Sequence, residues 1–560
     1  MQDVRQKLEN LIAEALRGLA EERGLSGEDL PEAFLERPRR EGQGDWATNV
    51  AMQGTKIFRE PPRKVAEALV RRIPTGTSSG IDKIEIAGPG FINFFLSSEW
   101  GHQVLSRILE EGENYGRCDL GQGRKVQVEF VSANPTGPLH VGHGRGAAVG
   151  DVTASLLEYA GWQVEREYYI NDAGLQMEIL GRSTQARYFE IGGNPEGAPF
   201  PENGYKGDYI YDLAREVMEE KGEAFLSLPL EESLEYFTAF AAGKVLDTIK
   251  RDLEQFGVRF DVWFSEKSLY EKDMVPSMIE HLKGRDYAYD KEGAVWFRST
   301  AFGDEKDRVL IRSNGVPTYF ASDIAYHKNK YDRGFDLVIN VWGADHHGYV
   351  PRMKSAVEAL GRNPEDLQIM LIQFVNLLRG GEPVAMSTRS GQFETLEDVL
   401  REVGVDATRY FFLMRRCDSH LDFDLELAKT ASRDNPVYYV QYAHARICSI
   451  FREARERGVE LPSLEECDLH LLSSSEEQNL IKQLGLFPEE VAKAAREFEP
   501  HRVVFYLYDL ACAFHTFYNA HHILGETEEL RKARLLLCRG VQRVLQNALG
   551  IVRIGAPEQM

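Results

Sequence analysis

The spacing of apolar residues changes along the chain, and the first segment that it marks is a small N-terminal region. Residues 4–23 carry apolar side chains three and four positions apart among charged residues, which predicts an amphipathic helix. Farther on, Gly88-Pro-Gly90 separates two strand-like runs within residues 84–96, as the turn of a hairpin does. We therefore expect a small α+β domain over residues 1–115.

A strand–helix–strand pattern begins near residue 120. Polar and apolar residues alternate over 125–130, apolar residues at helical spacing follow, and residues 164–170 look like a second strand. The later runs 337–342 and 369–375 are almost continuously apolar, which is typical of parallel strands covered on both faces. This pattern predicts a doubly wound parallel-sheet nucleotide-binding domain over residues 116–405.

Two helical regions complete the expected organisation. Residues from about 185–295 are predicted to form a mainly helical insertion that interrupts the nucleotide-binding domain. Beyond residue 405, long amphipathic stretches predict helices alone, and we expect an all-α bundle over residues 406–560. The predicted fold class is therefore α/β, with an N-terminal α+β domain and a C-terminal helical bundle.

Composition narrows the class of protein. The chain has 43% apolar and 28% charged residues, and it lacks a run of the roughly 18 apolar residues that would span a bilayer. Its six cysteines show neither metal-ligand nor redox spacing. We expect a cytoplasmic protein with reduced thiols, no metal site of its own and no membrane contact.

The charge balance argues against a nucleic-acid partner when it is taken alone. The formal net charge is −22, whereas phosphate binding normally depends on Lys and Arg. A local basic face can still exist on an acidic protein, and a strip between Arg531 and Arg553 that includes Arg534 is one candidate. A solvated helix face is the alternative interpretation of that strip.

The most informative segment is the loop from Ser132 to His143, between the first predicted strand and its helix. It ends in two imidazoles, His140 and His143, with Gly142 between them. The free N–H groups and the dipole of a helix N-terminus favour an anion. The segment therefore predicts a phosphate site equipped with two side-chain donors.

These histidines have three other possible interpretations. They could be ordinary loop residues, although the ordered strand, the Pro-Gly-Pro loop and the glycines make this the weaker reading. A zinc site lacks HExxH and CxxC partners in the sequence. A nicotinamide fingerprint fits Gly142–Ala147 formally, but the eight-residue connection Ser132–Leu139 is too long for that motif.

The run His140-Val-Gly-His143 resembles the "HIGH" signature of class I aminoacyl-tRNA synthetases. The surrounding segment and four later ones, in the same order along most of the chain, resemble arginyl-tRNA synthetase of the bacterial type. The segments are Val128–Arg145, Tyr169–Gly174, Tyr319–His327, Trp342–His347 and Asn435–Arg446.

This resemblance implies an arginine–tRNA ligase. Such an enzyme forms arginyl-adenylate from ATP, releases pyrophosphate, and then transfers arginine to the tRNA with release of AMP. The implied partners are L-arginine, ATP with Mg²⁺, and tRNA(Arg), and the implied state is a monomer. The resemblance also implies that the N-terminal domain contacts tRNA and that the helical bundle binds the anticodon.

Residue roles follow from the resemblance position by position. The expected ATP contacts are His140, Gly142, His143, Gly343, Asp345 and His346, and the two histidines are also expected to be catalytic. The expected arginine contacts are Glu129, Ser132 and Asn134 at the α-ammonium and carboxylate, Tyr319 and Asp323 at the guanidinium, and His347. The expected tRNA contacts in the segment that resembles the family are Tyr438, Tyr442 and Arg446, and Arg534 is a further expected contact from the basic strip.

One motif departs from the family pattern. Met386-Ser-Thr-Arg-Ser390 stands where class I enzymes usually carry Lys-Met-Ser-Lys-Ser, so that Ala385 and Thr388 replace both lysines. Met386 and Ser387 are still expected at ATP, and Arg389 is expected to supply the catalytic charge. Arg145 and Lys125 are further candidates for neutralising pyrophosphate.

Two rival functions come from other classes. A small-molecule nucleotidylyltransferase could share the paired histidines and the sheet, but it would not need more than 150 residues of terminal helices. A non-catalytic RNA-binding relative would explain the degenerate 386–390 motif. It would have little reason to retain the two histidines together with Asn134 and Asp323.

Overall fold

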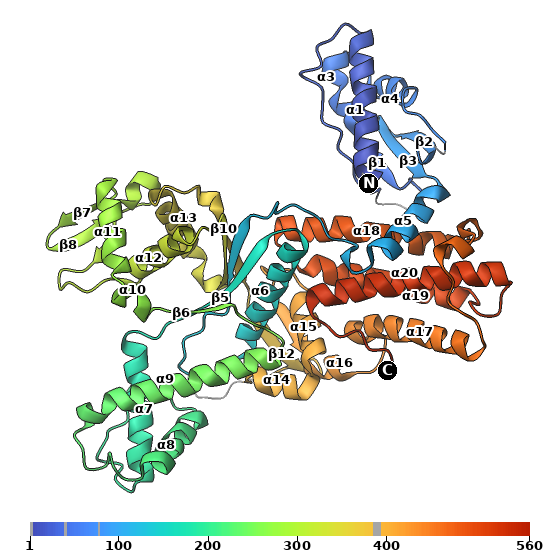
Figure 1. Cartoon of the computed structure of the whole chain (residues 1–560). Helices are drawn as coiled ribbons and strands as arrows, with labels where there is room; N and C mark the ends of the chain where they lie inside the picture. The colour runs from blue at the N-terminus through green and yellow to red at the C-terminus, as the bar shows by residue number, and fades with distance from the viewer. Residues whose placement is uncertain (1–3, 39–41, 77–78, 385–393) are drawn as a thin grey trace. The chain divides into compact units, whose positions relative to one another are not determined.

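The computed structural model describes residues 4–38, 42–76, 79–384 and 394–560. The expected ATP and catalytic contacts Met386, Ser387 and Arg389 lie outside the described residues. The chain divides into two compact units. The first comprises residues 1–112, 454–485 and 516–543, and the second comprises residues 113–453, 486–515 and 544–560. Figure 1 labels many of their elements.

The N-terminal part of the first unit is a small α+β fold. Strands β2 and β3 form a hairpin around Gly88 and Gly90, which both have positive φ, and β1 pairs with β3. Helix α1 buries its apolar stripe in this core. The elements are α1 (Val4–Glu22), β1 (Trp46–Thr48), α2 (Val50–Gln53), α3 (Thr55–Phe58), α4 (Pro62–Val70), β2 (Ile81–Ala87), β3 (Phe91–Leu96) and α5 (Ser98–Glu111).

A five-stranded parallel sheet is the centre of the second unit. Its strand order is β11-β10-β4-β5-β6, so the direction of winding reverses beside β4. Ligands of open α/β sheets bind at the carboxyl ends of the strands at such a reversal. The elements are β4 (Lys125–Glu129), α6 (Val141–Tyr159), β5 (Gln163–Ile170), β6 (Val262–Ser265), β10 (Leu337–Gly343) and β11 (Leu367–Ile372).

The region predicted as the insertion contains more than helices. Three helices connect β5 to β6, and β6 itself joins the central sheet because its short apolar run pairs with β5. A second, three-stranded sheet follows in the order β7-β8-β9. The elements are α7 (Leu175–Ile191), α8 (Asp208–Lys221), α9 (Leu230–Gln255), α10 (Lys267–Glu271), α11 (Met274–Gly284), β7 (Ala288–Lys291), β8 (Ala294–Phe297) and β9 (Arg308–Ile311).

The remaining elements are mostly helical. Strand β12 pairs with β13 and β14 in a small sheet, so the expectation of helices alone beyond residue 405 is wrong at β14, where apolar and acidic residues alternate and the strand pairs with β12. The segment after residue 435 is helical, as its periodicity predicts. Among the helices of the described ranges, none is long and apolar enough to cross a membrane. The elements are α12 (Tyr319–Asp332), α13 (Val350–Ala359), β12 (Val375–Arg379), β13 (Glu382–Pro383), α14 (Leu396–Val403), α15 (Val405–Leu413), β14 (Leu421–Asp424), α16 (Leu425–Lys429), α17 (Pro436–Glu456), α18 (Ser475–Glu497), α19 (His501–Ala520) and α20 (Glu528–Val552).

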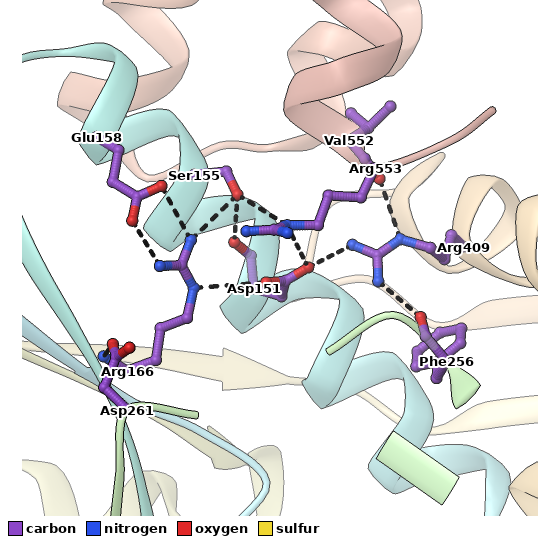
Figure 2. Close-up of polar contacts among 9 residues, drawn as sticks. All are labelled: Asp151, Ser155, Glu158, Arg166, Phe256, Asp261, Arg409, Val552 and Arg553. Carbon is purple, nitrogen blue, oxygen red and sulfur yellow. Dashed lines mark hydrogen bonds and ion pairs between the residues drawn. The ribbon is translucent and has the colours of Figure 1, made fainter. Parts of the chain in front are cut away.

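A buried group of charged side chains connects helix α6 with α15 and with the C-terminal ends of α9 and α20 (Figure 2). Asp151 and Arg409 are both fully buried, and Arg409 Nη2 donates to Asp151 Oδ2 at 2.6 Å. The same guanidinium donates to the carbonyl of Val552 at 3.0 Å and to that of Phe256 at 3.1 Å. Because these carbonyls end α20 and α9, Arg409 satisfies the C-terminal acceptors of two helices at once.

Two further arginines complete what we call the Asp151 cluster, namely Asp151, Arg166, Arg409 and Arg553. Arg553 Nε lies 3.2 Å from Asp151 Oδ2, and Arg166 Nε lies 3.5 Å from Oδ1. Arg166 also pairs with Glu158 at 2.5 Å. The cluster therefore surrounds one buried carboxylate with three guanidinium groups.

Candidate active site

The two signature histidines lie at the N-terminus of α6 with their rings stacked. His140 is the N-cap residue, and the ring centroids of His140 and His143 are 3.7 Å apart. His140 Nδ1 accepts from the backbone N–H of Gly142 at 3.1 Å, and His143 Nδ1 accepts from the backbone N–H of His140 at 3.4 Å. Since Nδ1 is the acceptor in each neutral ring, the proton of each ring is on Nε2.

Burial keeps both rings uncharged. It lowers the pKa of His143 to about 3, with repulsion from His140 as a second cause, and it also lowers the pKa of His140. Both imidazoles are therefore neutral at physiological pH. The site offers two N–H donors beside the helix N-terminus, which suits a phosphate oxygen without adding a full positive charge.

The structure contradicts both further candidates for neutralising pyrophosphate. Arg145 is buried, and its terminal nitrogens donate to the backbone carbonyls of Gln373, Arg416 and Ser419 at 2.8–2.9 Å. The guanidinium of Arg145 is thus bonded to three backbone carbonyls of loops. Lys125 begins β4 and so lies at the amino end of a parallel strand, at the sheet edge opposite to the histidines.

The expected adenine and ribose contacts follow β10. Gly343 ends this strand, and Asp345 and His346 belong to the short 3₁₀ turn after it. Their side chains form a His346 Nδ1 to Asp345 Oδ1 contact of 3.2 Å and are about 60% exposed. Since β10 is the parallel neighbour of β4, these groups share a sheet edge with the loop that carries the histidines.

Glu129 and Ser132 lie together at the end of β4. Ser132 Oγ donates to Glu129 Oε1 at 2.9 Å and accepts from the backbone N–H of Tyr169 at 3.1 Å. Val131 and Ser132 both have left-handed backbones, with φ of 68° and 41°. Such strain in a β-branched residue is uncommon, and it turns the chain sharply at the point where a ligand would bind.

Asp323 occupies the first turns of α12, and its contacts differ in part from the expected ones. The hydroxyl of Tyr349 donates to Asp323 Oδ2 at 2.6 Å. The expected arginine contact His347 belongs to the same 3₁₀ turn as Tyr349, and it is exposed. Tyr319 begins α12 with 66% of its surface exposed, one turn before Asp323. Asn134 donates to Gln176 at 2.7 Å.

A second buried carboxylate, Glu266, lies near enough to Asp323 for the two charges to repel each other, and local sequence patterns do not indicate it. Burial, with repulsion from Asp323 and Asp172, raises the pKa of Glu266 to about 7. Burial, with repulsion from Glu129, raises the pKa of Asp323 to about 6. Glu266 directly follows β6, so recognition of residues 262–265 as a strand of the central sheet would have placed an acid at its carboxyl end.

The expected tRNA contacts behave differently from one another. On α17, Tyr438 and Tyr442 stack with centroids 5.9 Å apart, and the Arg446 guanidinium lies 4.5 Å from the Tyr442 ring. In the other unit, Arg534 is buried, and its Nε donates to the buried Glu477 at 2.7 Å. The structure therefore argues against Arg534 as a phosphate contact, because its charge is already paired internally.

Comparisons with known proteins agree along the chain. Residues 104–415 match the model of the class I (R) tRNA synthetase catalytic domain, residues 6–96 match the arginyl-tRNA synthetase N-terminal domain, and residues 440–560 match the DALR anticodon-binding domain. Arginine–tRNA ligases of Syntrophotalea carbinolica and of Geobacter sp. are 55% and 54% identical to the chain, over all of both proteins.

Solved structures give the same result. The putative arginyl-tRNA synthetase of Campylobacter jejuni matches with a TM-score of 0.75 and 38% identity, covering 83% of this chain and 100% of that one. The Thermus thermophilus arginyl-tRNA synthetase shares the fold with a TM-score of 0.75 at 24% identity, covering 99% of this chain and 100% of the other. By full-length similarity to its relatives, the chain belongs to the arginyl-tRNA synthetase family.

Proposed function

We propose that the chain ligates L-arginine to tRNA(Arg) in two steps, through an arginyl-adenylate formed from ATP. Pyrophosphate leaves in the first step and AMP in the second. Full-length similarity to arginine–tRNA ligases supports the reaction. The observation that carries the chemistry is the pair of neutral Nε2–H donors at the start of α6, on the same sheet edge as an acidic pocket.

Adenylate formation needs no nucleophile from the protein, because the carboxylate of arginine attacks the α-phosphate of ATP in line. Catalysis then consists of positioning the reactants and stabilising charge on the phosphoryl oxygens. His140 and His143 donate to those oxygens together with the backbone N–H groups of α6. Gly142 allows close approach of the nucleotide, and Gly343, Asp345 and His346 hold adenine and ribose.

Mg²⁺ is proposed to accompany the nucleotide. In the described parts of the chain, no group of three or more His, Cys, Asp or Glu residues is arranged to hold a metal ion. Mg²⁺ commonly keeps several waters and binds through one or two carboxylates and substrate phosphates. Met386, Ser387 and Arg389 are proposed to contact the phosphates from the segment outside the described residues.

The acidic pocket is proposed to select arginine by its charge. A guanidinium keeps its proton and presents a fixed fork of donors, so it requires facing acceptors. Asp323 and Glu266 are the proposed acceptors, with Tyr319 and His347 beside them. Glu129, Ser132 and Asn134 receive the α-ammonium and the carboxylate.

The second step requires tRNA on the same molecule. Tyr438 and Tyr442 are half-buried rings stacked on each other, and Arg446 contacts Tyr442; we propose that unpaired bases of tRNA contact this group. We further propose a monomeric enzyme of the cytoplasm, as in the family that the sequence resembles.

Pyrophosphate release with ATP, each amino acid and tRNA, singly and in combination, tests the assignment. We expect release with arginine alone among the amino acids, and arginylated tRNA(Arg) as the final product. A nucleotidylyltransferase would release pyrophosphate without charging tRNA. A non-catalytic relative would release none under any combination, including the complete mixture.

A further inference from the structure

Lys330 is a fully buried lysine that contacts Glu129, and the proposed function gives it no role. The side chain of Lys330, near the end of α12, has no exposed surface, and its ammonium donates to Glu129 Oε2 at 2.6 Å and to Asn340 Oδ1 at 3.0 Å. Its Nζ also lies 4.3 Å from the centre of the Tyr326 ring. A buried charge is strongly unfavourable without partners, so this set of contacts is what makes a lysine tolerable here.

The contacts continue from Lys330 to Asp323. Asn340 Nδ2 lies 2.8 Å from His327 Nε2, and His327 Nδ1 lies 2.7 Å from the backbone carbonyl of Asp323. Burial lowers the pKa of His327 to about 3, so the ring is neutral, donates from Nδ1 and accepts at Nε2. One hydrogen-bonded chain thus links the backbone of Asp323 to the carboxylate of Glu129.

Glu129 is held at both carboxylate oxygens before any ligand arrives. Lys330 occupies Oε2, and Ser132 donates to Oε1 at 2.9 Å. Each carboxylate oxygen has two acceptor directions, so the group can still accept from a ligand. A carboxylate that is already ordered loses less conformational freedom when it binds.

We propose that Lys330 is a positioning residue, which fixes Glu129 to receive the α-ammonium of arginine at a set spacing from Asp323. The inference rests on the proposed function, because it takes Glu129 to be the ammonium contact. Lys330 touches no substrate atom. Its effect is selective for ligands that carry a cation at both ends, and a ligand with the guanidinium alone does not depend on it.

The test compares L-arginine with 5-guanidinopentanoate, which has the guanidinium and the carboxylate but no α-ammonium. KM for arginine, KM for ATP and Ki for the analogue are measured by pyrophosphate exchange in the presence of tRNA. The proteins are the wild type, Lys330→Met, Glu129→Gln and the double variant. We expect Lys330→Met to raise KM for arginine about tenfold or more, as loss of a hydrogen bond to a charged group does, with the other two constants changed less than twofold.

The double variant tests whether Lys330 acts through Glu129. It removes both members of a buried ion pair, so it leaves no unpaired charge and is expected to fold even where Lys330→Met does not. Its loss for arginine should equal that of Glu129→Gln alone, because both residues act through one contact. An added loss in the double variant, or an equal loss for arginine and the analogue in Lys330→Met, would overturn the role of Lys330.

Failure of the inference and failure of the proposed function give different results. If Glu129→Gln abolishes the preference for arginine over 5-guanidinopentanoate and Lys330→Met leaves it intact, only the role of Lys330 is wrong. If Glu129→Gln also leaves the preference intact, the ammonium contact itself is wrong, and the role of Lys330 is overturned with it.

Discussion

Two buried groups of charged side chains lie in the second unit, and they are balanced in opposite ways. The Asp151 cluster places three guanidinium groups around one carboxylate, and its surplus of positive charge faces the carbonyl ends of two helices. The proposed arginine site contains the carboxylates of Glu129, Asp323 and Glu266, and one ammonium, that of Lys330, pairs with Glu129. In the first group guanidinium groups outnumber the central carboxylate, whereas among the described residues named for the second group three carboxylates accompany one ammonium.

The pKa values report this difference. Repulsion between neighbouring carboxylates adds to burial in raising the pKa of Glu266 and Asp323, which means that the ionised forms are held there at a cost. A ligand that brings cations relieves that cost. Incomplete charge compensation in a buried group is therefore a sign of a binding site, and complete compensation is a sign of a structural contact.

The largest effect is expected from breaking the satisfied group. Arg409→Met removes the guanidinium that pairs with the fully buried Asp151 and donates to a carbonyl at the end of each of two helices. It should lower the free energy of unfolding by about 3–5 kcal/mol. Urea unfolding monitored by circular dichroism measures this. A loss below about 1 kcal/mol would show that the Asp151 cluster is not a structural contact of the buried kind.

The next effect is expected on binding. Asp323→Asn should weaken arginine binding by about 2–5 kcal/mol, because it leaves the guanidinium without its main charged acceptor, while stability changes little. Calorimetric titration with arginine measures the first and thermal unfolding the second. Asp332→Asn, an exposed carboxylate on the same helix that pairs with Lys328, is the matched control. Unchanged arginine affinity in Asp323→Asn would place the guanidinium elsewhere.

Substituting one of the two neutral histidines should change the reaction, as for Asp323, and not the stability, as for Arg409. His143→Asn removes one phosphate donor that acts mainly in the transition state, so adenylation should slow by about 10²–10³ with KM for ATP and arginine nearly unchanged. Single-turnover adenylate formation measures the rate. A loss confined to KM would mean that His143 binds the ground state and does not stabilise the transition state.

A smaller effect is expected from pH. The pKa values of Glu266 and Asp323 are raised to about 7 and about 6, so the ionised forms that bind a guanidinium are lost as the pH falls through these values. Between pH 8 and pH 6, kcat/KM for arginine should drop roughly twentyfold, since the ionised fraction falls about tenfold for Glu266 and about twofold for Asp323. Glu266→Gln should remove the part of this decrease that occurs near pH 7. A wild-type profile that is flat in this range would show that these acids do not contact the substrate.

The smallest effect is expected at the surface. Arg401, on the helix before that of Arg409, pairs with Glu397 at 2.8 Å, and the two side chains are 68% and 41% exposed. Arg401→Met should cost only about 0.2–1 kcal/mol in unfolding free energy, since solvent screens such pairs. The same urea unfolding assay serves both arginines. A cost comparable to that of Arg409→Met would mean that burial does not separate the two kinds of ion pair.

The sequence predicts the architecture well wherever local patterning dominates. The Gly88–Gly90 hairpin, the strand–loop–helix around His140 and the helices after residue 435 all follow from turn residues and periodicity. Alternation over 125–130 was less reliable as a guide to burial, because Gln127 and Glu129 are buried too. For Glu129 another element supplies the partner, because α12 carries Lys330.

The candidate site was predictable where motifs are contiguous. Glu266 and Lys330 were missed because their roles depend on partners far away in sequence, such as Asp323 and Glu129. Arg534 was chosen from a run of basic residues, but periodicity alone cannot show that its partner Glu477 lies buried against it. Long-range pairing is the part of the site that local sequence does not encode.

The Asp151 cluster also bears on the order in which the nascent chain can mature. Helix α6 is among the early parts of the catalytic sheet to leave the ribosome, yet its buried carboxylate meets Arg409 more than 250 residues later and Arg553 some 400 residues later. Until those residues emerge, Asp151 has Arg166 at 3.5 Å but lacks its other two guanidinium partners. Residue 553 must therefore be translated before the Asp151 cluster is complete, and contacts of such long sequence separation favour slow, late consolidation.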